Sequence, residues 1–293
     1  MSDATENVGK RITVFLLITM ALSAIFYVLI GAAGTVEGGG SLYVLGMMWS
    51  PGVAAIVTRL LFQGNLRGMG WRWGRTRYQL WSYLLPFLLA LVAYVPVWLT
   101  GLGGFYDQTF VAQMAGRFGL PPSQPALVIL VALLYAGTVG MVGSLVSALG
   151  EEIGWRGFLV PELAKTNNFA RTSLISGIIW AVWHYPGIIL GIYSSGAPAW
   201  YVLMAYTVFI LGFSFLLAWF RFKSGSVWTA MFLHASYNLF VQAIFTPLTV
   251  DTGPTAYFIT EFGAAMAVVY AIVGYVVWRR RGALLDNAQP LSE

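Results

Sequence analysis

The chain of 293 residues is 58% hydrophobic and only 9% charged, which is too apolar for a soluble domain of this length. Its net charge of +5 comes from cations at the ends of apolar stretches rather than on one continuous face, which argues against nucleic acid as a partner. Because it contains no cysteine, the chain has no disulfide, no thiol nucleophile and no thiolate metal ligand.

Apolar stretches long enough to cross a bilayer recur along the whole chain. Crossing a hydrocarbon core of about 30 Å takes about 20 mostly apolar residues in a helix. Residues such as Pro51, Pro86, Pro96 and Pro186 fall inside these stretches and are expected to kink helices or to start re-entrant segments. The sequence predicts about eight transmembrane helices, at 12–33, 41–63, 79–101, 125–149, 171–193, 200–220, 226–247 and 257–278.

This pattern predicts an all-α, polytopic integral membrane protein with the lipid bilayer as its surroundings. No repeat or long linker divides the chain, so 1–293 is expected to form a single membrane domain. The longest connections are predicted at 64–78 and 101–124.

The distribution of Lys and Arg predicts the orientation of the helices. Lys and Arg are more frequent in short loops that lie on the cytoplasmic side of the membrane. They precede the first stretch and follow the second, fourth, sixth and eighth, whereas the four opposite loops hold only Arg117. Both termini are therefore predicted to be cytoplasmic, in the plasma membrane if the cell is prokaryotic.

Few ionisable residues lie within the predicted helices, and each is a candidate for function. Placing one at the bilayer midplane costs roughly 2.5 to 3.5 kcal/mol on insertion scales. The two histidines of the chain, His184 and His234, lie in the fifth and seventh stretches. Glu151, Glu152 and Arg156 follow the end of the fourth stretch and are expected to begin a short helix.

The spacing of these residues predicts which side chains can act together. Glu152 and Arg156 are four apart and can pair on one helix face, whereas Glu151 is rotated by about 100° and stays available for chemistry. His234 and Asn238 are also four apart and form a polar stripe on the seventh helix. A partly buried carboxylate can take a proton from water and return it to a leaving amine.

Three motifs in order resemble the CAAX protease and bacteriocin-processing (CPBP, or ABI) family, which includes the type II CAAX prenyl endopeptidases. The family pattern is Glu-Glu-x-x-x-Arg, then Phe-x-x-x-His, then His-x-x-x-Asn or Asp, on separate helices of an eight-helix membrane fold. The first motif matches over Glu151–Arg156 and the third over His234–Asn238. In the second, Trp180 takes the place of Phe before His184. The motifs cover 151–238.

The resemblance implies an intramembrane endopeptidase in which Glu151 and His184 activate a water and His234 and Asn238 stabilise the oxyanion. Glu152 and Arg156 would then hold the site in shape. Acyl transfer needs a group that shuttles protons on one side of the reacting carbonyl and preorganised hydrogen-bond donors on the other. The division of roles between the two pairs of residues agrees with this requirement. The expected substrate is a membrane-associated, and in this family often lipidated, peptide or protein at the cytoplasmic membrane face.

The same residues leave the metal question open. Glu151, His184 and His234 also form a three-ligand set with room for a water, as in catalytic zinc sites. However, no His-Glu-x-x-His motif is present, and Asn238 beside His234 fits an oxyanion pair better than a ligand sphere. We therefore favour a site without metal or other cofactor, with zinc as the alternative.

Other interpretations compete with the peptidase. The glutamate pair alone could simply stabilise the N-terminus of a helix through its dipole. Either histidine or Asn238, taken singly, could form a structural hydrogen bond between two helices. Tryptophans such as Trp155, Trp180, Trp183 and Trp228 are more often packing or interface residues, so none is predicted as a site residue. A polytopic transporter or proton relay also uses Glu and His within helices. A bacteriocin-immunity or scaffold protein without peptidase activity is a further alternative.

Overall fold

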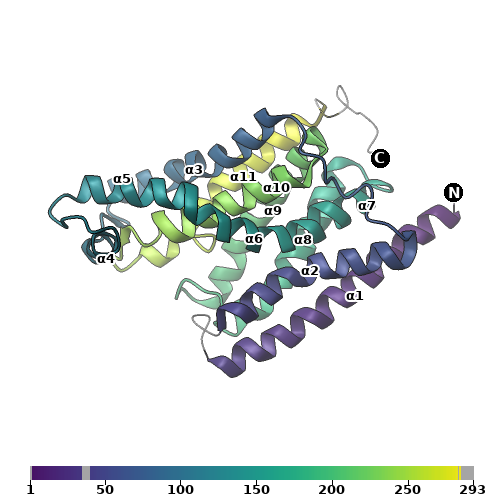
Figure 1. Ribbon diagram of the computed structural model, residues 1–293, viewed down its shortest axis with the longest axis horizontal. Coiled ribbons are helices and arrows are strands. Elements are labelled where there is room, and N and C mark those ends of the chain that lie inside the picture. The colour runs from purple at the N-terminus through teal and green to yellow at the C-terminus, as the bar shows by residue number, and fades with distance from the viewer. Residues whose placement is uncertain (1, 35–39, 283, 285–293) are drawn as a thin grey trace.

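The computed structural model describes residues 2–34, 40–282 and 284, and nearly all of them are helical (Figure 1). The α-helices are α1 (Ser2–Ala33), α2 (Gly40–Gln63), α3 (Thr76–Leu99), α4 (Gln108–Phe118), α5 (Pro125–Tyr135), α6 (Met141–Glu152), α7 (Val160–Ala164), α8 (Phe169–Ile189), α9 (Ala199–Ser224), α10 (Val227–Tyr237) and α11 (Ala264–Arg279). Three π-helical segments extend them: η1 (Ala136–Gly140), η2 (Ile153–Leu159) and η3 (Asn238–Phe245). A 3₁₀ turn, η4 (Thr255–Tyr257), precedes α11.

The predicted all-α, multi-pass fold is confirmed. Within the described residues, five helices are long and apolar enough to cross a membrane, namely Asn7–Ala33, Ser41–Gln63, Thr76–Leu99, Pro125–Ala164 and Ala199–Ser224. The other three predicted stretches coincide with α8, with α10 and η3 together, and with the shorter α11. For these three, crossing of the membrane stays a prediction.

One sequence-based boundary was wrong. The fourth stretch does not stop at 149, because α5, η1, α6, η2 and α7 form one helical run of 40 residues, Pro125–Ala164. The π-helical segments keep the backbone hydrogen-bonded and so let the run continue through Glu151 and Arg156. The prolines inside apolar stretches are all accommodated within helices, and none begins a re-entrant segment in the described chain.

The predicted long loop 101–124 is also partly ordered into secondary structure. Its short strand β1 (Gly104–Phe105) pairs antiparallel with β2 (Thr249–Val250). Helix α4 follows, with Asp107 as its N-cap and Gly119 in the left-handed conformation at its C-cap. This helix is short and amphipathic, and an 11-residue segment is too short to cross a bilayer.

The helices are arranged so that α6 lies between α2 and α10 (Figure 1). Helices α1 and α2 run side by side along one edge of the molecule, and α9 packs against both α8 and α11. A glycine allows α6 and α2 to cross at a short distance. A Cβ on Gly150 of α6 would lie 2.7 Å from the Cα of Trp49 on α2, so only glycine fits there. This crossing fixes the position of the next two residues, Glu151 and Glu152.

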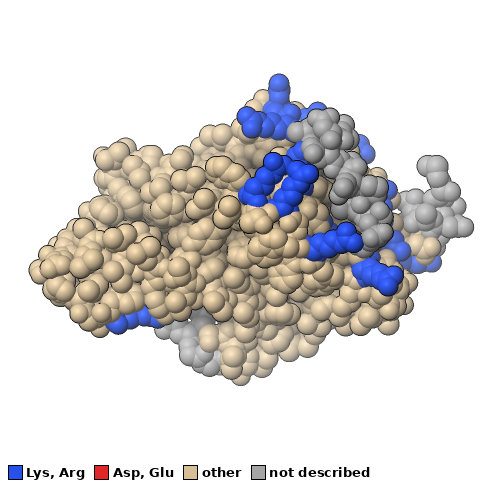
Figure 2. Space-filling view, turned by 45° about the horizontal axis from the view of Figure 1, so that its top comes forward, with Lys and Arg blue, Asp and Glu red and all other residues tan. Residues whose placement is uncertain are grey.

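Basic side chains gather at one end of the molecule. Figure 2 shows most of the Lys and Arg of the visible face toward this end, which Figure 1 shows to hold the start of α1 and the α2–α3 connection. We call it the basic end. Because Lys and Arg favour the cytoplasmic side, it is predicted to face the cytoplasm.

Candidate active site

Side chains of all three sequence motifs meet in one buried cluster between α6, α8 and α10. On α6, Glu152 accepts a hydrogen bond from Nδ1 of His234 on α10 at 2.9 Å. Beside it, Glu151 accepts one from the indole of Trp180 on α8 at 2.7 Å. Residues 82 positions apart in the chain are thereby in direct contact.

The carboxylate of Glu151 is held by two tryptophans. Its side chain is 2% exposed, and Oε2 accepts N–H from Trp180 at 2.7 Å and from Trp155 at 3.2 Å. The other oxygen, Oε1, accepts no hydrogen bond from the described residues. One oxygen therefore orients the carboxylate, and the other is left with its hydrogen-bonding capacity unused.

The predicted pairing of Glu152 with Arg156 is confirmed. Oε1 of Glu152 lies 2.9 Å from Nη1 of Arg156, and both side chains are fully buried. The guanidinium also reaches the hydroxyl of Ser214 on α9 at 3.4 Å and lies 4.1 Å from the ring centroid of Trp180. Burial of two charges is costly unless they are paired. The same oxygen of Glu152 also lies 2.9 Å from Nδ1 of His234.

His184 is oriented by the backbone of its own helix. Its Nδ1 lies 3.0 Å from the carbonyl oxygen of Trp180. A carbonyl only accepts hydrogen bonds, so this contact assigns the proton to Nδ1 and leaves Nε2 as an acceptor in the neutral imidazole. The half-buried ring lies among aromatic side chains, 4.6 Å from Trp183 and 5.2 Å from Tyr206 between centroids.

Asn238 stands at the junction of α10 and η3. Its backbone N–H bonds to the carbonyl oxygen of His234, so the expected one-turn spacing of the two residues is kept. The side chain is half-buried, and among the described residues it has no hydrogen-bond partner. An amide placed in this way can donate to a group that enters the site.

Sequence analysis missed the tryptophans of the site. Trp180 was expected to pack, but it contacts every part of the cluster: its N–H bonds to Glu151, its ring lies 5.3 Å from that of His234, and Arg156 lies over its face. The available signal was the aromatic position of the second motif, where only tryptophan, unlike Phe, carries an N–H donor.

A second buried carboxylate, Glu261, was also missed. It accepts hydrogen bonds from the hydroxyls of Tyr193 and Tyr237, and from Nε2 of Gln242 at 2.8 Å. The Tyr193 ring lies 5.7 Å from that of His184, which links this carboxylate to the motif cluster. No sequence motif marks Glu261, because its partners come from three separate segments.

The residues proposed as an alternative zinc set do not converge. Within the described part of the chain, no group of three or more His, Asp or Glu side chains is arranged to hold a metal ion. We derive no catalytic step through a metal.

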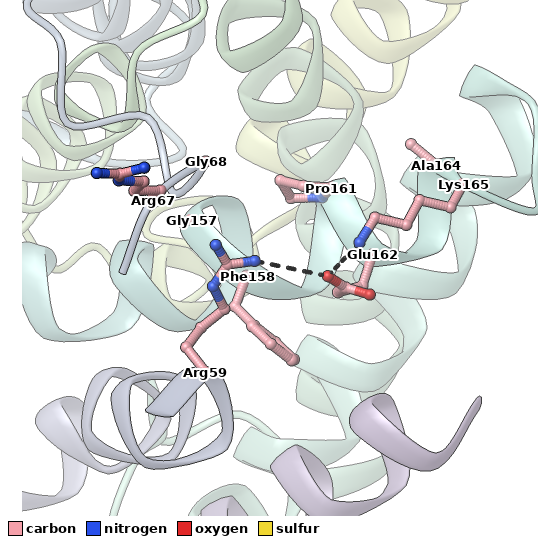
Figure 3. A pocket seen from close by; sticks show the side chains of 9 residues that line it. All are labelled: Arg59, Arg67, Gly68, Gly157, Phe158, Pro161, Glu162, Ala164 and Lys165. Carbon is pink, nitrogen blue, oxygen red and sulfur yellow. Dashed lines mark hydrogen bonds and ion pairs between the residues drawn. The ribbon is translucent and has the colours of Figure 1, made fainter. Parts of the chain in front are cut away.

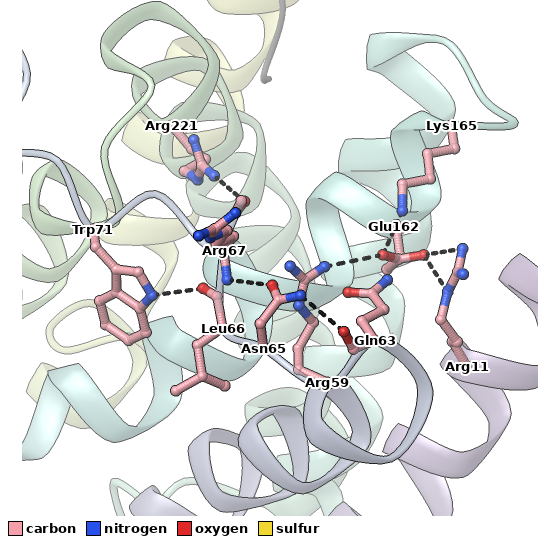
Figure 4. Close-up of polar contacts among 11 residues, drawn as sticks. Arg11, Arg59, Gln63, Asn65, Leu66, Arg67, Trp71, Glu162, Lys165 and Arg221 are labelled. Atoms are coloured by element: carbon pink, nitrogen blue, oxygen red, sulfur yellow. Dashed lines mark hydrogen bonds and ion pairs between the residues drawn. The ribbon is translucent and has the colours of Figure 1, made fainter. Parts of the chain in front are cut away.

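Cations expected only to set orientation form a separate cluster at the basic end. The buried carboxylate of Glu162 on α7 lies 2.9 Å from Arg11, 2.5 Å from Lys165 and 3.9 Å from Arg59 (Figure 4). A cavity of about 400 Å³ adjoins it, with Arg59 between Arg67 and Glu162 (Figure 3). None of the candidate catalytic residues lines this cavity. The Glu162 cluster is therefore distinct from the motif cluster.

Comparison with known proteins agrees with the motifs. Residues 122–240 match the family model "Type II CAAX prenyl endopeptidase Rce1-like", and this range contains every motif residue. The chain is also 29% identical over 138 residues to CAAX prenyl protease 2 of Methanococcus maripaludis. That alignment covers 45% of this chain and 47% of the relative, so the chain spans about half the length of the curated relative it matches. Over residues 122–240, the chain is therefore similar to the Rce1-like type II CAAX prenyl endopeptidases.

Proposed function

We propose that this protein is an intramembrane endopeptidase that hydrolyses a peptide bond with a water activated by Glu151 and His184. One observation carries the proposal: helices α6, α8 and α10 bring side chains of all three motifs together, with hydrogen bonds from Trp180 to Glu151 and from His234 to Glu152, and with the rings of Trp180 and His234 5.3 Å apart.

In this proposal, Glu151 is the general base. Its free Oε1 accepts a proton from water while the two indole N–H groups fix the carboxylate. Nε2 of His184 accepts a second hydrogen bond from the same water, which orients the lone pair toward the scissile carbonyl carbon. Glu151 then returns the proton to the leaving amine as the carbon–nitrogen bond breaks.

The opposite side of the site would stabilise the tetrahedral intermediate. Asn238 and His234 face the same side of α10, one helical turn apart, and both carry N–H donors. Glu152 acts through His234: it accepts Nδ1–H and orients the ring, and in the imidazolium form, which carries a proton on both nitrogens, Nε2 donates to the reacting oxygen. Arg156 holds the carboxylate of Glu152 in place through the ion pair at 2.9 Å. We propose that no metal takes part.

The proposed substrate is a membrane-associated, lipidated peptide or protein. The relative from Methanococcus maripaludis is named a prenyl protease, and the matched domain is of the prenyl endopeptidase type. A prenylated cysteine would keep the peptide at the membrane face, where the cluster can reach it. We place the reaction at the cytoplasmic face of a plasma membrane, on the basis of the basic end.

The direct test is cleavage by the purified full chain in lipid nanodiscs. Three fluorogenic peptides of one sequence would be compared: one prenylated at its cysteine, one palmitoylated and one unmodified. Cleavage of the prenylated peptide alone supports the full proposal, and equal cleavage of all three supports a peptidase of broader specificity. Uptake of solutes by proteoliposomes without any cleavage would instead favour the transporter alternative.

A further inference from the structure

An apolar groove with a basic mouth lies on the outer surface between α3, α9 and α11. Its volume is about 550 Å³, and its walls are formed by apolar side chains such as Trp81, Leu85, Leu216, Ile272 and Val276. None of the motif residues lines it, so it is independent of the proposed catalytic site. Two of the three helices that form it, α3 and α9, are long and apolar enough to cross a membrane, so a groove on their outer surface would face lipid.

Two arginines close the same end of the groove. Arg77 lies in the first turn of α3 and Arg280 directly follows the last residue of α11, so both stand at the basic end. Neither forms an ion pair within the described chain; the only polar side-chain contact of Arg77 is the hydroxyl of Tyr78 at 3.1 Å. Among the residues that the structure describes, no Asp or Glu lines the groove. Its charge is therefore complementary to an anion at the level of lipid headgroups.

A buried polar atom of one groove-lining residue also lacks a partner. Trp219 of α9 lines the groove, and its indole Nε1 is buried without any hydrogen bond to the described residues. An unpaired buried donor is unfavourable, and most such groups are paired in native structures. An acceptor on a molecule in the groove would satisfy this N–H once the side chain turns it toward the groove.

The dimensions fit one end of a phospholipid. The eight residue-to-residue steps from Arg77 to Leu85 on α3, and the eight from Ile272 to Arg280 along α11, each correspond to about 12 Å of helix. A molecule with a phosphate at the arginines, an ester oxygen near Trp219 and a hydrocarbon chain beyond would meet each of these features in order.

We propose that this groove binds an anionic glycerophospholipid. The phosphate lies between Arg77 and Arg280, one ester or phosphate oxygen accepts the N–H of Trp219, and an acyl chain lies along α3 and α11. A zwitterionic lipid binds less well, because the groove offers its ammonium group no carboxylate. A free phosphate binds less well, because it leaves the apolar groove and Trp219 unfilled.

The full chain would be delipidated, reconstituted with equal amounts of phosphatidylglycerol and phosphatidylcholine, and examined by native mass spectrometry. We expect phosphatidylglycerol to be retained preferentially. In R77Q/R280Q this preference should fall by about fivefold for each arginine removed. The matched control is R75Q/R279Q, which removes the same charge from arginines that do not line the groove and should keep the preference.

Trp219 provides a second, uncharged test. W219F removes the N–H and keeps an aromatic ring, so it should weaken retention of both lipids, whereas W278F, outside the groove, should not. The proposal is overturned if both double variants lose the preference equally, since the effect is then general surface charge. It is also overturned if inorganic phosphate displaces the lipid as readily as phosphatidylglycerol does. A change in oligomeric state alone in R77Q/R280Q would likewise overturn it, because the groove would then bind a second copy of the chain.

Discussion

Trp180 donates its indole N–H to the carboxylate of Glu151 across the α6–α8 interface at 2.7 Å. The backbone carbonyl of the same residue lies 3.0 Å from Nδ1 of His184. One residue thus orients both groups that we propose to activate water. Phe, the usual residue of the family at this position, could supply the carbonyl contact but not the N–H.

Replacing Trp180 by Phe should therefore reduce turnover while the protein still folds. A hydrogen bond to a charged group contributes about 1.5 to 3 kcal/mol. If that bond positions Glu151 for proton transfer, kcat should fall by about tenfold to a hundredfold. The measurement is kcat on a lipidated fluorogenic peptide in nanodiscs, together with the Tm of the variant.

The matched control is W183F. Trp183 is equally buried and its indole also donates at 2.7 Å to another helix, but the acceptor is Ser23 on α1. This variant should lower Tm and leave kcat nearly unchanged. A loss of kcat in W183F as large as in W180F would mean that packing of α8, rather than the contact with Glu151, governs activity.

The two adjacent glutamates should respond differently to the same substitution. E151Q keeps the size of the side chain but removes the proposed base, so kcat should collapse while Tm and substrate binding stay near those of the unchanged protein. E152Q leaves Arg156 and His234 without their carboxylate partner. Breaking a buried pair of this kind costs about 3 to 5 kcal/mol, so Tm and yield should fall.

Turnover and thermal unfolding of both variants would be measured in the same detergent. Near-normal turnover in E151Q, with complete loss in a stable E152Q, would reverse the roles of the two residues. Activity retained in both would place the active site elsewhere.

The sequence predicted the parts of this site that depend on spacing within one helix. The Glu152–Arg156 pair and the one-turn relation of His234 to Asn238 both follow from helix periodicity. Contacts between helices were not predictable in this way. The bond from His234 to Glu152 depends on how α6 and α10 pack, which the close approach at Gly150 helps to set.

The fold shows the same division. Hydropathy predicted the positions of the apolar helices, because length and composition alone decide whether a segment can cross a bilayer. It failed at 149, where the polar residues Glu151, Glu152 and Arg156 suggested an end to the helix. In the structure Glu152 pairs with Arg156 and Glu151 accepts indole N–H groups, and the helix continues as η2 and α7. Burial of paired charges is a tertiary effect that a hydropathy pattern does not contain.

N238A should lose activity without losing stability. The side chain of Asn238 has no partner among the described residues, so its removal breaks no hydrogen bond that holds the fold. If it donates to the oxyanion, the loss should be about 2.7 to 4 kcal/mol of transition-state stabilisation, or roughly a hundredfold to a thousandfold in kcat. Single-turnover measurements would separate this loss from weaker substrate binding.

Gln242, four residues further along η3, gives the control. Its amide donates to Glu261 at 2.8 Å rather than pointing to the motif cluster, so Q242A should affect Tm more than kcat. Equal losses of kcat in N238A and Q242A would show that the conformation of η3, and not an amide in the oxyanion site, determines the rate.

The predicted orientation can be tested by labelling single cysteines, because the chain has no cysteine of its own. Ser123, between α4 and α5, and Thr166, after α7, are both exposed and lie at opposite ends of the run Pro125–Ala164. In sealed right-side-out vesicles, S123C should react with an impermeant maleimide, and T166C should react only after the membrane is permeabilised. Labelling of both from the outside would contradict the orientation inferred from Lys and Arg.

Removal of metal should leave the peptidase active. The proposed mechanism uses Oε1 of Glu151 and Nε2 of His184 as acceptors for water, and neither requires a cation to lower the charge on the reacting oxygen. After exhaustive dialysis against a strong chelator, kcat should stay within about twofold of its starting value, because catalytic zinc contributes orders of magnitude when it is present. Elemental analysis of the dialysed protein would verify that zinc is below about one tenth of the protein on a molar basis. Loss of activity that zinc alone restores would show that Glu151, His184 and His234 rearrange into a ligand set. In that case E151Q, H184A and H234A should each reduce the bound zinc, whereas N238A should lower kcat and keep the zinc content unchanged.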